Sequence, residues 1–594
     1  MGWRIDSVRS ALQSRYPVLT KRAWRRGDQM RPSADRVPRP VFRSPDVRRF
    51  RRMAEARRNA DITHRWAMKP DPGEWPAVTI CTVTHESEGW LTRYLDAIAA
   101  LDYPKDKLGL VVVDNGSEDG TVSGLRSWAA NSGLADVDIV ERRGNAGFGD
   151  SMTLAASRAR TPYLLLLNPD AAIRPDALRI VVREALDDLD DVHAWEMRQL
   201  PYPHPKYYDP VTRETAWTSH AAVLLRREAF DLAEYGAPFF LYGEDVDFSY
   251  RLRGTGKRLR YVPKAAVDHD ALGDTDAREG QRTRTLLANR VLRQQFGRPL
   301  DRLQGRLLSV WIALRSRDPA ERQALAETNK ALSALGRIPS IRRSGIAYPF
   351  WGPHFSRRRT GATVARRTLT DGPTVSIITR THAGFPFLHH TLASVGNQTY
   401  PNIEHIVVQD GGDDAPHPLD GLDVPHGPIA LKAEQPGRSA AGNAALAAAT
   451  GEYVMFLDHD DFLFADHVEV LLGHVGDAPA AYGLAWEAVG RAVAGFVHAK
   501  QFSLPYADVG AFSRARLEAG NFLPIQSVLF RRDLFARFGG FDTSLDVHED
   551  WDLWKRYAQA GDFVAVPAVT SVYFTPGSLL ERIRRQGRFR RPKR

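Results

Sequence analysis

Runs of apolar residues alternate with amphipathic segments over much of this 594-residue chain. A short apolar run bounded by charged or turn residues is typical of a buried strand, and a 3.6-residue spacing of apolar positions is typical of a helix. Between residues 77 and 270, the predicted strands are 78–83, 108–113, 137–140 and 163–167, and the predicted helices are 90–100, 121–131 and a helix that ends near residue 160. Strands that alternate with helices predict an α/β domain with a mainly parallel sheet.

The same pattern returns from residue 374. The predicted strands are 375–379, 403–408, 429–432 and 453–457, with helices at 387–395 and at about 437–449. The spacing of polar residues also agrees between the halves, since Asp114 lies 29 residues after His85 and Asp410 lies 28 residues after His382. An internal repeat of this length indicates a duplicated domain.

The repeat divides the chain into five parts. We expect a basic N-terminal extension (1–75), a first α/β domain (76–275), a helical connector and linker (276–370), a second α/β domain (371–578) and a basic C-terminal tail (579–594). In the extension, apolar residues between Trp3 and Tyr16 share one helical face, which suits either an anionic bilayer or the protein's own surface. In the connector, the apolar run 307–314 is expected to pack on another part of the protein.

Composition and charge narrow the class of protein. A content of 43% hydrophobic and 26% charged residues is that of an ordinary globular protein. No run approaches the roughly 20 apolar residues of a membrane span, and no signal peptide is evident, so we expect a cytoplasmic protein. The single cysteine, Cys81, excludes an intramolecular disulfide. The net charge of +10 is concentrated in the tails and indicates an anionic partner, a membrane surface or nucleic acid, or simple solvation.

Carboxylates follow the predicted strand 453–457 directly. Asp458 and Asp460 are two residues apart and so point to the same side of an extended chain. Carboxylates this close repel one another unless a cation lies between them, and hard oxygen ligands suit Mg²⁺ or Mn²⁺. In the first half, Asn168-Pro169-Asp170 follows strand 163–167 in the same way.

Each half contains a second acidic cluster at a similar place. Glu244-Asp245 and Glu549-Asp550 both precede an amphipathic segment. Acidic residues at the start of a helix interact favourably with its dipole, so helix capping is one interpretation. Their recurrence at equivalent positions favours a role in catalysis.

Four features thus occur twice in the same order: a strand that ends near an Asp, a Gly/Asn turn into a helix, a strand before a DxD-like motif, and a Glu-Asp pair. In this respect the chain resembles family 2 glycosyltransferases of the GT-A fold, over about 77–270 and 374–578. The Asn145-x-Gly147-Phe148 turn and Asn168-Pro169-Asp170 resemble the rhamnosyltransferase-like branch of that family. The resemblance implies two Rossmann-like GT-A domains in tandem, nucleotide-sugar donors, and Mn²⁺ or Mg²⁺ as cofactor.

The resemblance also implies roles for individual residues. Contacts with the nucleotide-sugar are expected from Thr84, Asp114, Asn145 and Gly147 in the first half and from Thr381, Asp410, Arg438 and Asn443 in the second. The metal ligands would be Asn168, Asp170 and His269, and Asp458, Asp460 and Asp461. Asp245 and Asp550 would be the general bases, with Glu244 and Glu549 beside them. The second half has no histidine at the place that corresponds to His269.

We therefore expect a bifunctional inverting glycosyltransferase that builds a cell-surface polysaccharide on a lipid-linked acceptor. The basic tails would hold it at the anionic inner face of the plasma membrane, and no nucleic acid is expected as a partner. Segments 190–220 and 480–525 are expected to be loops that contact donor and acceptor sugars. Two alternatives stay open. In the first, only one domain is catalytic and the other is a scaffold or acceptor-binding relic. In the second, the protein binds nucleic acid through its basic tails.

Overall fold

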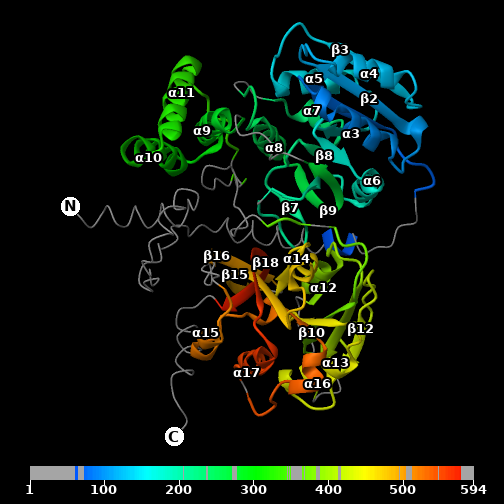
Figure 1. Cartoon of the computed structure of the whole chain (residues 1–594), viewed down its shortest axis with the longest axis vertical. Helices are drawn as coiled ribbons and strands as arrows, with labels where there is room; N and C mark the ends of the chain where they lie inside the picture. The colour runs from blue at the N-terminus through cyan, green and yellow to red at the C-terminus, as the bar shows by residue number, and fades with distance from the viewer. Residues whose placement is uncertain are drawn as a thin grey trace.

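The chain folds into two α/β domains joined by a helical connector (Figure 1). The computed structural model describes residues 61–64, 72–204, 206–235, 239–269, 277–343, 346, 348, 364–366, 368–382, 388–411, 416–493, 496–503, 511–545 and 547–576. The two domains lie one above the other along the longest axis, and α9, α10 and α11 lie beside the first domain. The predicted pair of α/β domains with a helical segment between them is confirmed.

The first domain is built on a nine-stranded sheet of order β3-β2-β1-β4-β8-β6-β9-β5, with β7 beside β9. Its strands are β1 (Val78–Thr84), β2 (Leu108–Asp114), β3 (Asp136–Glu141), β4 (Tyr163–Leu167), β5 (Ala171–Ile173), β6 (Val192–Leu200), β7 (Glu214–Thr215), β8 (Ala222–Arg226) and β9 (Arg258–His269). Its helices are α3 (Glu88–Ala99), α4 (Thr121–Ala129), α5 (Phe148–Arg158), α6 (Ala177–Asp187), α7 (Ala229–Leu232) and α8 (Glu244–Gly254). Strands β1 to β4 pair in parallel, and β8 is antiparallel to β4 and β6.

The second domain repeats this sheet with the order β12-β11-β10-β13-β17-β15-β18-β14, and β16 pairs with β15. Its strands are β10 (Val375–Thr381), β11 (Ile403–Gln409), β12 (Ile429–Lys432), β13 (Tyr453–Phe456), β14 (Phe462–Leu463), β15 (Ala480–Val493), β16 (Phe496–Ser503), β17 (Val528–Arg531) and β18 (Val564–Pro576). Its helices are α12 (Leu388–Gly396), α13 (Arg438–Ala448), α14 (His467–Val475), α15 (Arg514–Ala519), α16 (Asp533–Phe538) and α17 (Glu549–Tyr557). The predicted duplication therefore extends to the order of every main strand.

Helices cover both faces of each sheet, so the parallel strands are apolar on both sides. In β1, Ile80 faces the core beneath α3, whereas Cys81 faces the core beneath α5. Cys81 is fully buried, and burial raises the pKa of its thiol to about 12. The cysteine is thus a small apolar side chain of the core.

One expectation about the loops is wrong. Segments 190–220 and 480–525 contain β6 and the paired strands β15 and β16, which belong to the part of each sheet that mixes parallel and antiparallel pairs. Strand β6 is buried along its whole length although it carries His193, Glu196 and Arg198. Glu196 is paired with Lys206 and Arg198 with Glu469, and such tertiary contacts leave no periodic signal in the sequence.

The connector consists of α9 (Ala277–Phe296), α10 (Pro299–Arg315) and α11 (Pro319–Leu335). Helix α9 packs on α8 through a cluster that includes Tyr250, Leu292 and Phe296. A smaller cluster, centred on Leu308, Ile312 and Leu325, joins the three connector helices. Among the described helices, none combines the length and the apolar character that crossing a bilayer requires.

The two domains share a buried interface. Arg198 on β6 donates to both carboxylate oxygens of Glu469 on α14, at 2.5 and 3.3 Å, and both side chains are almost fully buried. Tyr208 and Tyr261 of the first domain pack with Phe464 and Trp486 of the second. The domains therefore form one packed unit.

Part of the predicted N-terminal extension belongs to the first domain. Residues 61–64 are helical, and the buried carboxylate of Asp61 pairs with Arg258 and Arg260 of β9 at 2.6 to 3.2 Å. The amphipathic segment predicted between Trp3 and Tyr16 lies outside the described residues.

Candidate active sites

Asp114 lies at the carboxyl end of β2 and is buried. Thr84 Oγ1 donates to its Oδ1 at 2.8 Å, and Ser117 donates through its backbone N–H (2.8 Å) and its hydroxyl (2.6 Å). Thr84, the last residue of β1, is the register partner of Asp114. The carboxylate is thereby fixed at the edge of the sheet where ligands of parallel α/β folds bind.

Asp410 does not take the same register position as Asp114. Thr381 pairs with Gln409, and the backbone N–H of Asp410 donates to Thr381 O, as that of Asn115 does to Thr84 O. Asp410 is therefore the counterpart of Asn115, one residue later than the spacing between motifs indicated. Its Oδ1 accepts the backbone N–H of Gly437 at 2.5 Å.

The turn that precedes α5 is held by amide side chains. Asn145 Oδ1 accepts the backbone N–H of Gly147 at 2.9 Å, and Asn115 Nδ2 donates to the Asn145 side chain and to Gly147 O. Gly147 has φ +87°, and a Cβ there would lie 2.8 Å from the carbonyl oxygen of Phe240. The turn thus packs directly against the loop that leads into α8.

The corresponding turn of the second domain carries both predicted residues. Asn443 exchanges two hydrogen bonds with the backbone of Phe541, at 2.7 and 2.9 Å, and so fixes the loop before α17. Arg438, at the start of α13, donates to Glu549 Oε2 at 2.7 Å.

At the acidic strand tip of the first domain, Asp170 lies next to His269. Asp170 Oδ2 is 3.2 Å from His269 Nε2, and His269 Nδ1 is 2.9 Å from Gln199 Oε1. This contact follows from the pairing of Ala171 on β5 with His269 on β9. Asp170 Oδ1 is buried and has no hydrogen-bond partner. Asn168, two residues earlier, precedes the same turn.

The second acidic cluster of this domain lies at the start of α8, after Tyr242 and Gly243 in left-handed conformations. Glu244 is 6% exposed, and its Oε2 is buried without a partner. Burial and the neighbouring charge of Asp245 raise the pKa of Glu244 to about 8. Burial also raises the pKa of Asp245 to about 6. This rise is opposed by the hydrogen bond that Asp245 Oδ1 accepts from the backbone N–H of Val246 and by the buried cation of Lys206.

Tyr242 connects the strand tip with the helix start. Burial raises the pKa of its hydroxyl, Arg284 lowers it, and the carboxylates of Glu244 and Asp170 both raise it further. The charges of both acidic groups thus raise the pKa of the same hydroxyl.

In the second domain, Arg380 connects the two acidic groups directly. Its guanidinium donates to Asp458 Oδ1 and Oδ2 at 2.8 and 2.9 Å and to Glu549 Oε1 at 3.3 Å. Arg380 is 4% exposed, and Asp458 is 29% exposed. Burial raises the pKa of Asp458, but the ion pair with Arg380 outweighs burial and leaves this pKa below its usual value. The strand tip and the helix start lie within reach of one arginine.

Neighbouring residues of the second site also differ from those of the first. Phe462 pairs with Val572, as Ala172 pairs with Asp268, so Tyr573 takes the register position of His269. Asp461 Oδ1 accepts the backbone N–H of Phe574 at 3.1 Å, and burial together with Asp460 and Asp458 raises the pKa of Asp461 well above its usual value.

The two sites differ in how their carboxylates are satisfied. Asp550 accepts from the Trp551 backbone and from Asn521 at 2.8 and 3.0 Å, and Arg380 and Arg438 occupy both oxygens of Glu549. In the first site, one oxygen of Asp170 and one of Glu244 are buried without a partner. An orphaned carboxylate oxygen beside a histidine fits a divalent cation. A carboxylate whose two oxygens both pair with an arginine does not offer a free oxygen to such a cation.

Within the described residues, no three His, Cys, Asp or Glu side chains converge in a group that could hold a metal ion. A cation in the first site would therefore depend on Asp170 and His269 together with oxygens of the donor. Mg²⁺ characteristically shares its coordination in this way between a few carboxylates and substrate phosphates.

Three basic residues of the sites were missed from the sequence. Arg380 interrupts the apolar strand β10 at the position where β1 has Val83. A charged residue at this position of a buried strand could have indicated a site residue from the sequence alone. Lys206 lies fully buried beneath α8, and its Nζ pairs with Glu196 and donates to Trp217 O at 3.0 Å. Arg284 of α9 lies over the ring of Phe240. The contacts of Lys206 and Arg284 depend on the tertiary fold alone.

Comparison with known proteins identifies both domains. The family model described as "Glycosyl transferase family 2" matches residues 79–231 and 376–538. "Uncharacterized glycosyltransferase YwdF" of Bacillus subtilis is 28% identical over 206 residues, which are 34% of this chain and 73% of YwdF. "N-acetylglucosaminyl-diphospho-decaprenol L-rhamnosyltransferase" of Mycobacterium tuberculosis is 25% identical over 32% of this chain and 75% of its own.

Solved structures show weaker similarity. The mannosyltransferase PcManGT of Pyrobaculum calidifontis, in complex with GDP-Man and Mn²⁺, is 21% identical, with a TM-score of 0.32 over 50% of this chain and 88% of PcManGT. For two other curated relatives, the chain spans 62% and 12% of their length.

Proposed function

Because the chain belongs to glycosyltransferase family 2 and carries the family's domain twice, we propose that it is a bifunctional inverting glycosyltransferase. Each domain would transfer one sugar from a nucleotide-sugar donor. The acceptor would be a lipid-linked glycan that is extended toward a cell-surface polysaccharide. The similarity to a rhamnosyltransferase whose name specifies a diphospho-decaprenol acceptor supports this class of acceptor. Two sites in one packed unit keep the first product at high effective concentration for the second.

One observation carries this proposal. In the second domain, Arg380 contacts both the strand-tip carboxylate Asp458 and the helix-start carboxylate Glu549. The first domain carries acidic residues at the same two kinds of position, Asp170 at a strand tip and Glu244 at a helix start. These positions support a site in each domain in which a group that would face the donor phosphates lies near a group that would accept a proton.

In the first domain, Asp114 and the Asn145–Gly147 turn would hold the nucleotide. Asp170 and His269, with Asn168, would hold a Mn²⁺ or Mg²⁺ ion, which when bound neutralises the negative charge of the diphosphate. Asp245 would accept the proton of the acceptor hydroxyl as that oxygen forms its bond to the anomeric carbon, while the bond from this carbon to the donor diphosphate breaks and the nucleoside diphosphate leaves. Its raised pKa suits a base near neutral pH, because the proton affinity is then matched to the medium.

In the second domain, the residues present favour an arginine over a metal. Arg380 and Arg438 would face the donor diphosphate and stabilise the charge that develops on it. Asp550 would be the base, since burial raises its pKa and Asn521 fixes one of its oxygens. The expected ligands Asp460 and Asp461 would then orient the donor.

A second candidate function is that only the first domain transfers a sugar. The complete pairing of Asp458 and Glu549 favours it, because a closed set of ion pairs also describes a site that has lost its substrate. Under this alternative, the second domain would bind the acceptor or serve as a scaffold.

A donor screen tests the proposal. The full chain is incubated with a panel of UDP-, GDP- and dTDP-sugars, Mn²⁺ or Mg²⁺, and a short polyprenyl-diphosphate glycan, and the products are identified by mass. The proposal predicts two successive mass increments. A single increment would select the one-domain alternative, and no transfer from any donor would contradict the enzymatic function.

A further inference from the structure

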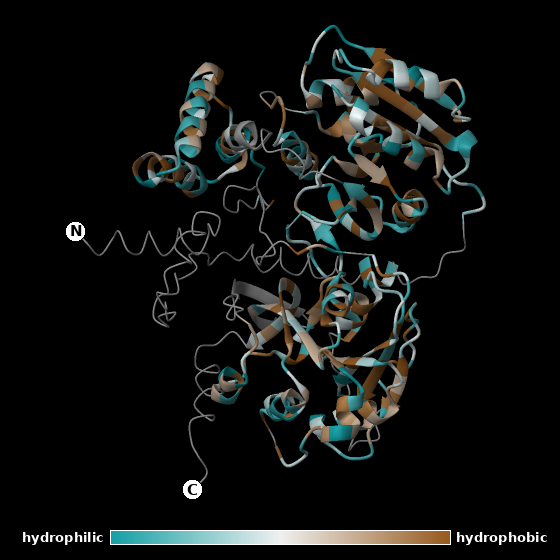
Figure 2. Ribbon diagram, in the orientation of Figure 1, coloured by the Kyte–Doolittle hydropathy of each residue, from teal (hydrophilic) through white to brown (hydrophobic). Residues whose placement is uncertain are grey.

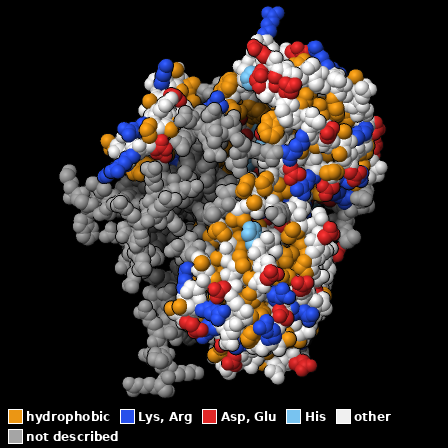
Figure 3. Space-filling view, in the orientation of Figure 1, with side chains coloured by type: hydrophobic (Ala, Val, Ile, Leu, Met, Phe, Trp, Pro, Cys, Tyr) orange, Lys and Arg blue, Asp and Glu red, His pale blue; other side chains and the backbone are white. Residues whose placement is uncertain are grey.

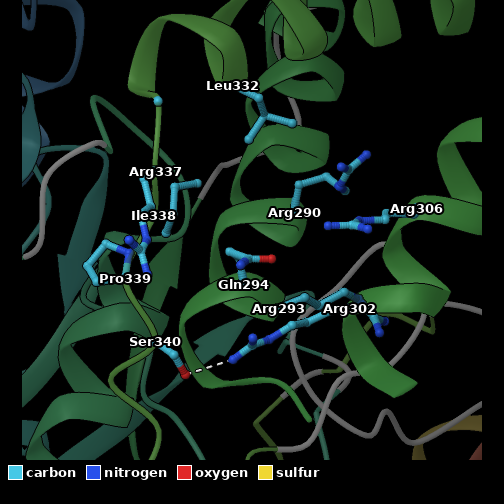
Figure 4. A pocket seen from close by; sticks show the side chains of 11 residues that line it. Arg290, Arg293, Gln294, Arg302, Arg306, Leu332, Arg337, Ile338, Pro339 and Ser340 are labelled. Carbon is cyan, nitrogen blue, oxygen red and sulfur yellow. Dashed lines mark hydrogen bonds between the residues drawn. The ribbon is translucent and has the colours of Figure 1, made fainter. Parts of the chain in front are cut away.

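A cavity of ≈ 660 Å³ lies between the connector helices, outside both candidate active sites (Figure 4). Five of its lining residues are arginines: Arg290 and Arg293 from α9, Arg302 and Arg306 from α10, and Arg337 from the segment after α11. No acidic residue lines it. We call these five residues the arginine basin.

Three guanidinium groups of the basin donate to neutral oxygens. Arg290 donates to Ser309 Oγ at 2.6 Å, Arg293 to Asn289 Oδ1 and Asp301 O, and Arg302 to Ser340 Oγ at 2.7 Å. Among the described residues, no carboxylate forms an ion pair with Arg290, Arg302, Arg306 or Arg337. Burial and the charge of Arg306 lower the pKa of Arg290, as expected for cations that lack a counter-ion. The basin thus concentrates positive charge in one cavity.

Helix α10 also presents apolar side chains to solvent. Leu300, Leu303, Leu307, Val310 and Leu314 are between 39% and 76% exposed. Their spacing of three and four residues places them on one helical face. Leu308 and Ile312 of the same helix point instead into the connector core. The apolar run therefore packs within the connector on one side only, and its other side forms what we call the α10 stripe.

The stripe and the basin adjoin. Arg302 and Arg306 each precede a stripe leucine by one residue, so they lie about 100° around the helix from it. Figure 2 shows hydrophobic residues along α10, and Figure 3 shows hydrophobic and basic side chains side by side on the connector. An apolar face flanked by arginines is the pattern of a helix that lies in a membrane interface.

We propose that the α10 stripe and the arginine basin together dock the protein on an anionic phospholipid bilayer. The stripe inserts among the acyl chains near the headgroups, and a lipid phosphate enters the basin. A free phosphate in solution would satisfy the basin alone, whereas only a bilayer satisfies both surfaces. The exposed apolar residues beside the basin therefore favour the bilayer.

Helix α9, which shares the basin with the docked helix α10, packs against the first candidate active site. Helix α9 contributes Arg290 and Arg293 to the basin, and Arg284 of the same helix lies close enough to influence Glu244 and Tyr242. A Cβ on Gly243, the residue before α8, would lie 2.6 Å from Ala288 of α9. Docking through α10 would thus hold the mouth of the first site near the membrane surface.

Vesicle co-sedimentation with the full chain tests the proposal. Vesicles of phosphatidylcholine alone are compared with vesicles that contain 30% phosphatidylglycerol. Arg306→Gln/Arg337→Gln is expected to lower the partition coefficient for the anionic vesicles about 30-fold, since each basic residue near such a surface contributes about fivefold. Leu307→Ser/Leu314→Ser is expected to lower it by at least about tenfold, because the apolar face no longer inserts.

Matched controls separate docking from folding and from the basic tails. Arg322→Gln on the exposed side of α11 and Leu422→Ser in the second domain are expected to bind like the wild type. The basin variant should unfold at the wild-type temperature or higher, because it removes uncompensated repulsion. Unchanged vesicle binding by either test variant would overturn the proposal and assign binding to the tails.

Two further outcomes would also overturn it. In the first, the basin variant is no longer stabilised by inorganic pyrophosphate but still binds vesicles like the wild type. This result would assign the basin to free anions. In the second, the wild-type protein is retained on duplex DNA in the absence of vesicles, and both variants lose this retention. The test is independent of the proposed function, because failure of that function appears as absent sugar transfer and failure of docking as unchanged vesicle binding.

Discussion

Replacing Arg380 by valine, the residue at the equivalent position of β1, removes the group that connects the acidic residues of the second site. Asp458 and Glu549 would lose three hydrogen bonds from a guanidinium that is 4% exposed. Breaking a buried ion pair by removing one partner costs about 3–5 kcal/mol. Asp458 is 29% exposed and can regain some hydration, so we expect a loss near 3 kcal/mol in the free energy of unfolding.

The same substitution should create a cation site. With the guanidinium absent, Asp458 regains two free oxygens beside Asp460, and Mn²⁺ can take the place of the lost positive charge. A ligand that binds only the native state at 100 times its dissociation constant restores about 2.7 kcal/mol. The wild-type second site should show no such restoration, because Arg380 already occupies Asp458.

Thermal unfolding with and without Mn²⁺ measures both effects. The comparison is made in an Asp170→Ala background, so that the first site does not contribute, and Arg380→Lys serves as the control that keeps the charge but not the bidentate geometry. We expect Arg380→Val to unfold earlier than Arg380→Lys and to recover with Mn²⁺. An Arg380→Val variant that is as stable as its parent, or that ignores Mn²⁺, would refute the reasoning.

Three further predictions follow from the site and the interface. Asp170→Ala should abolish the stabilisation that Mn²⁺ gives the wild-type chain in the presence of a nucleotide-sugar, measured by calorimetry, and stabilisation that persists would place the cation elsewhere. Transfer by the first domain should fall about tenfold per pH unit below pH about 6, because burial raises the pKa of Asp245 to about 6 and only its ionised form is a base; a flat profile from pH 5 to 7 would exclude this role. Glu469→Gln should lower the free energy of unfolding by about 3 kcal/mol in denaturant titrations, since it leaves Arg198 buried without a counter-ion, whereas Arg537→Gln in an exposed pair should change it by less than about 0.5 kcal/mol.

Much of the fold was predictable because the parallel strands are apolar on both faces. Strand β4 (Tyr163–Leu167) was predicted residue for residue, since a run of four leucines between Pro162 and Asn168 allows few other interpretations. In the other half of each sheet, β6 and β15 were not predicted. Strand β6 carries polar residues that are buried by partners from distant segments, such as Glu469 for Arg198, and a local pattern cannot show this.

The candidate sites follow the same division. The order of motifs located the carboxylates, because strand tips and helix starts are local features. The asymmetry between the sites was not evident from the motifs, since it depends on which side chain fills the space between them. The sequence motif of the second site is the more complete, with Asp458, Asp460 and Asp461, yet its first carboxylate is occupied by Arg380. The motif of the first, with Asn168 in place of an aspartate, leaves Asp170 and Glu244 with free oxygens.

The central claim is that each domain carries its own catalytic cleft. It is tested most directly by the masses of the products formed by the wild type, Asp245→Asn and Asp550→Asn from the same acceptor and donors. We expect the wild type to add two sugars and each variant to lose a different one, because an asparagine side chain keeps the shape of the base but cannot take up the proton. A variant at either position that forms the complete wild-type product would contradict the claim for that domain.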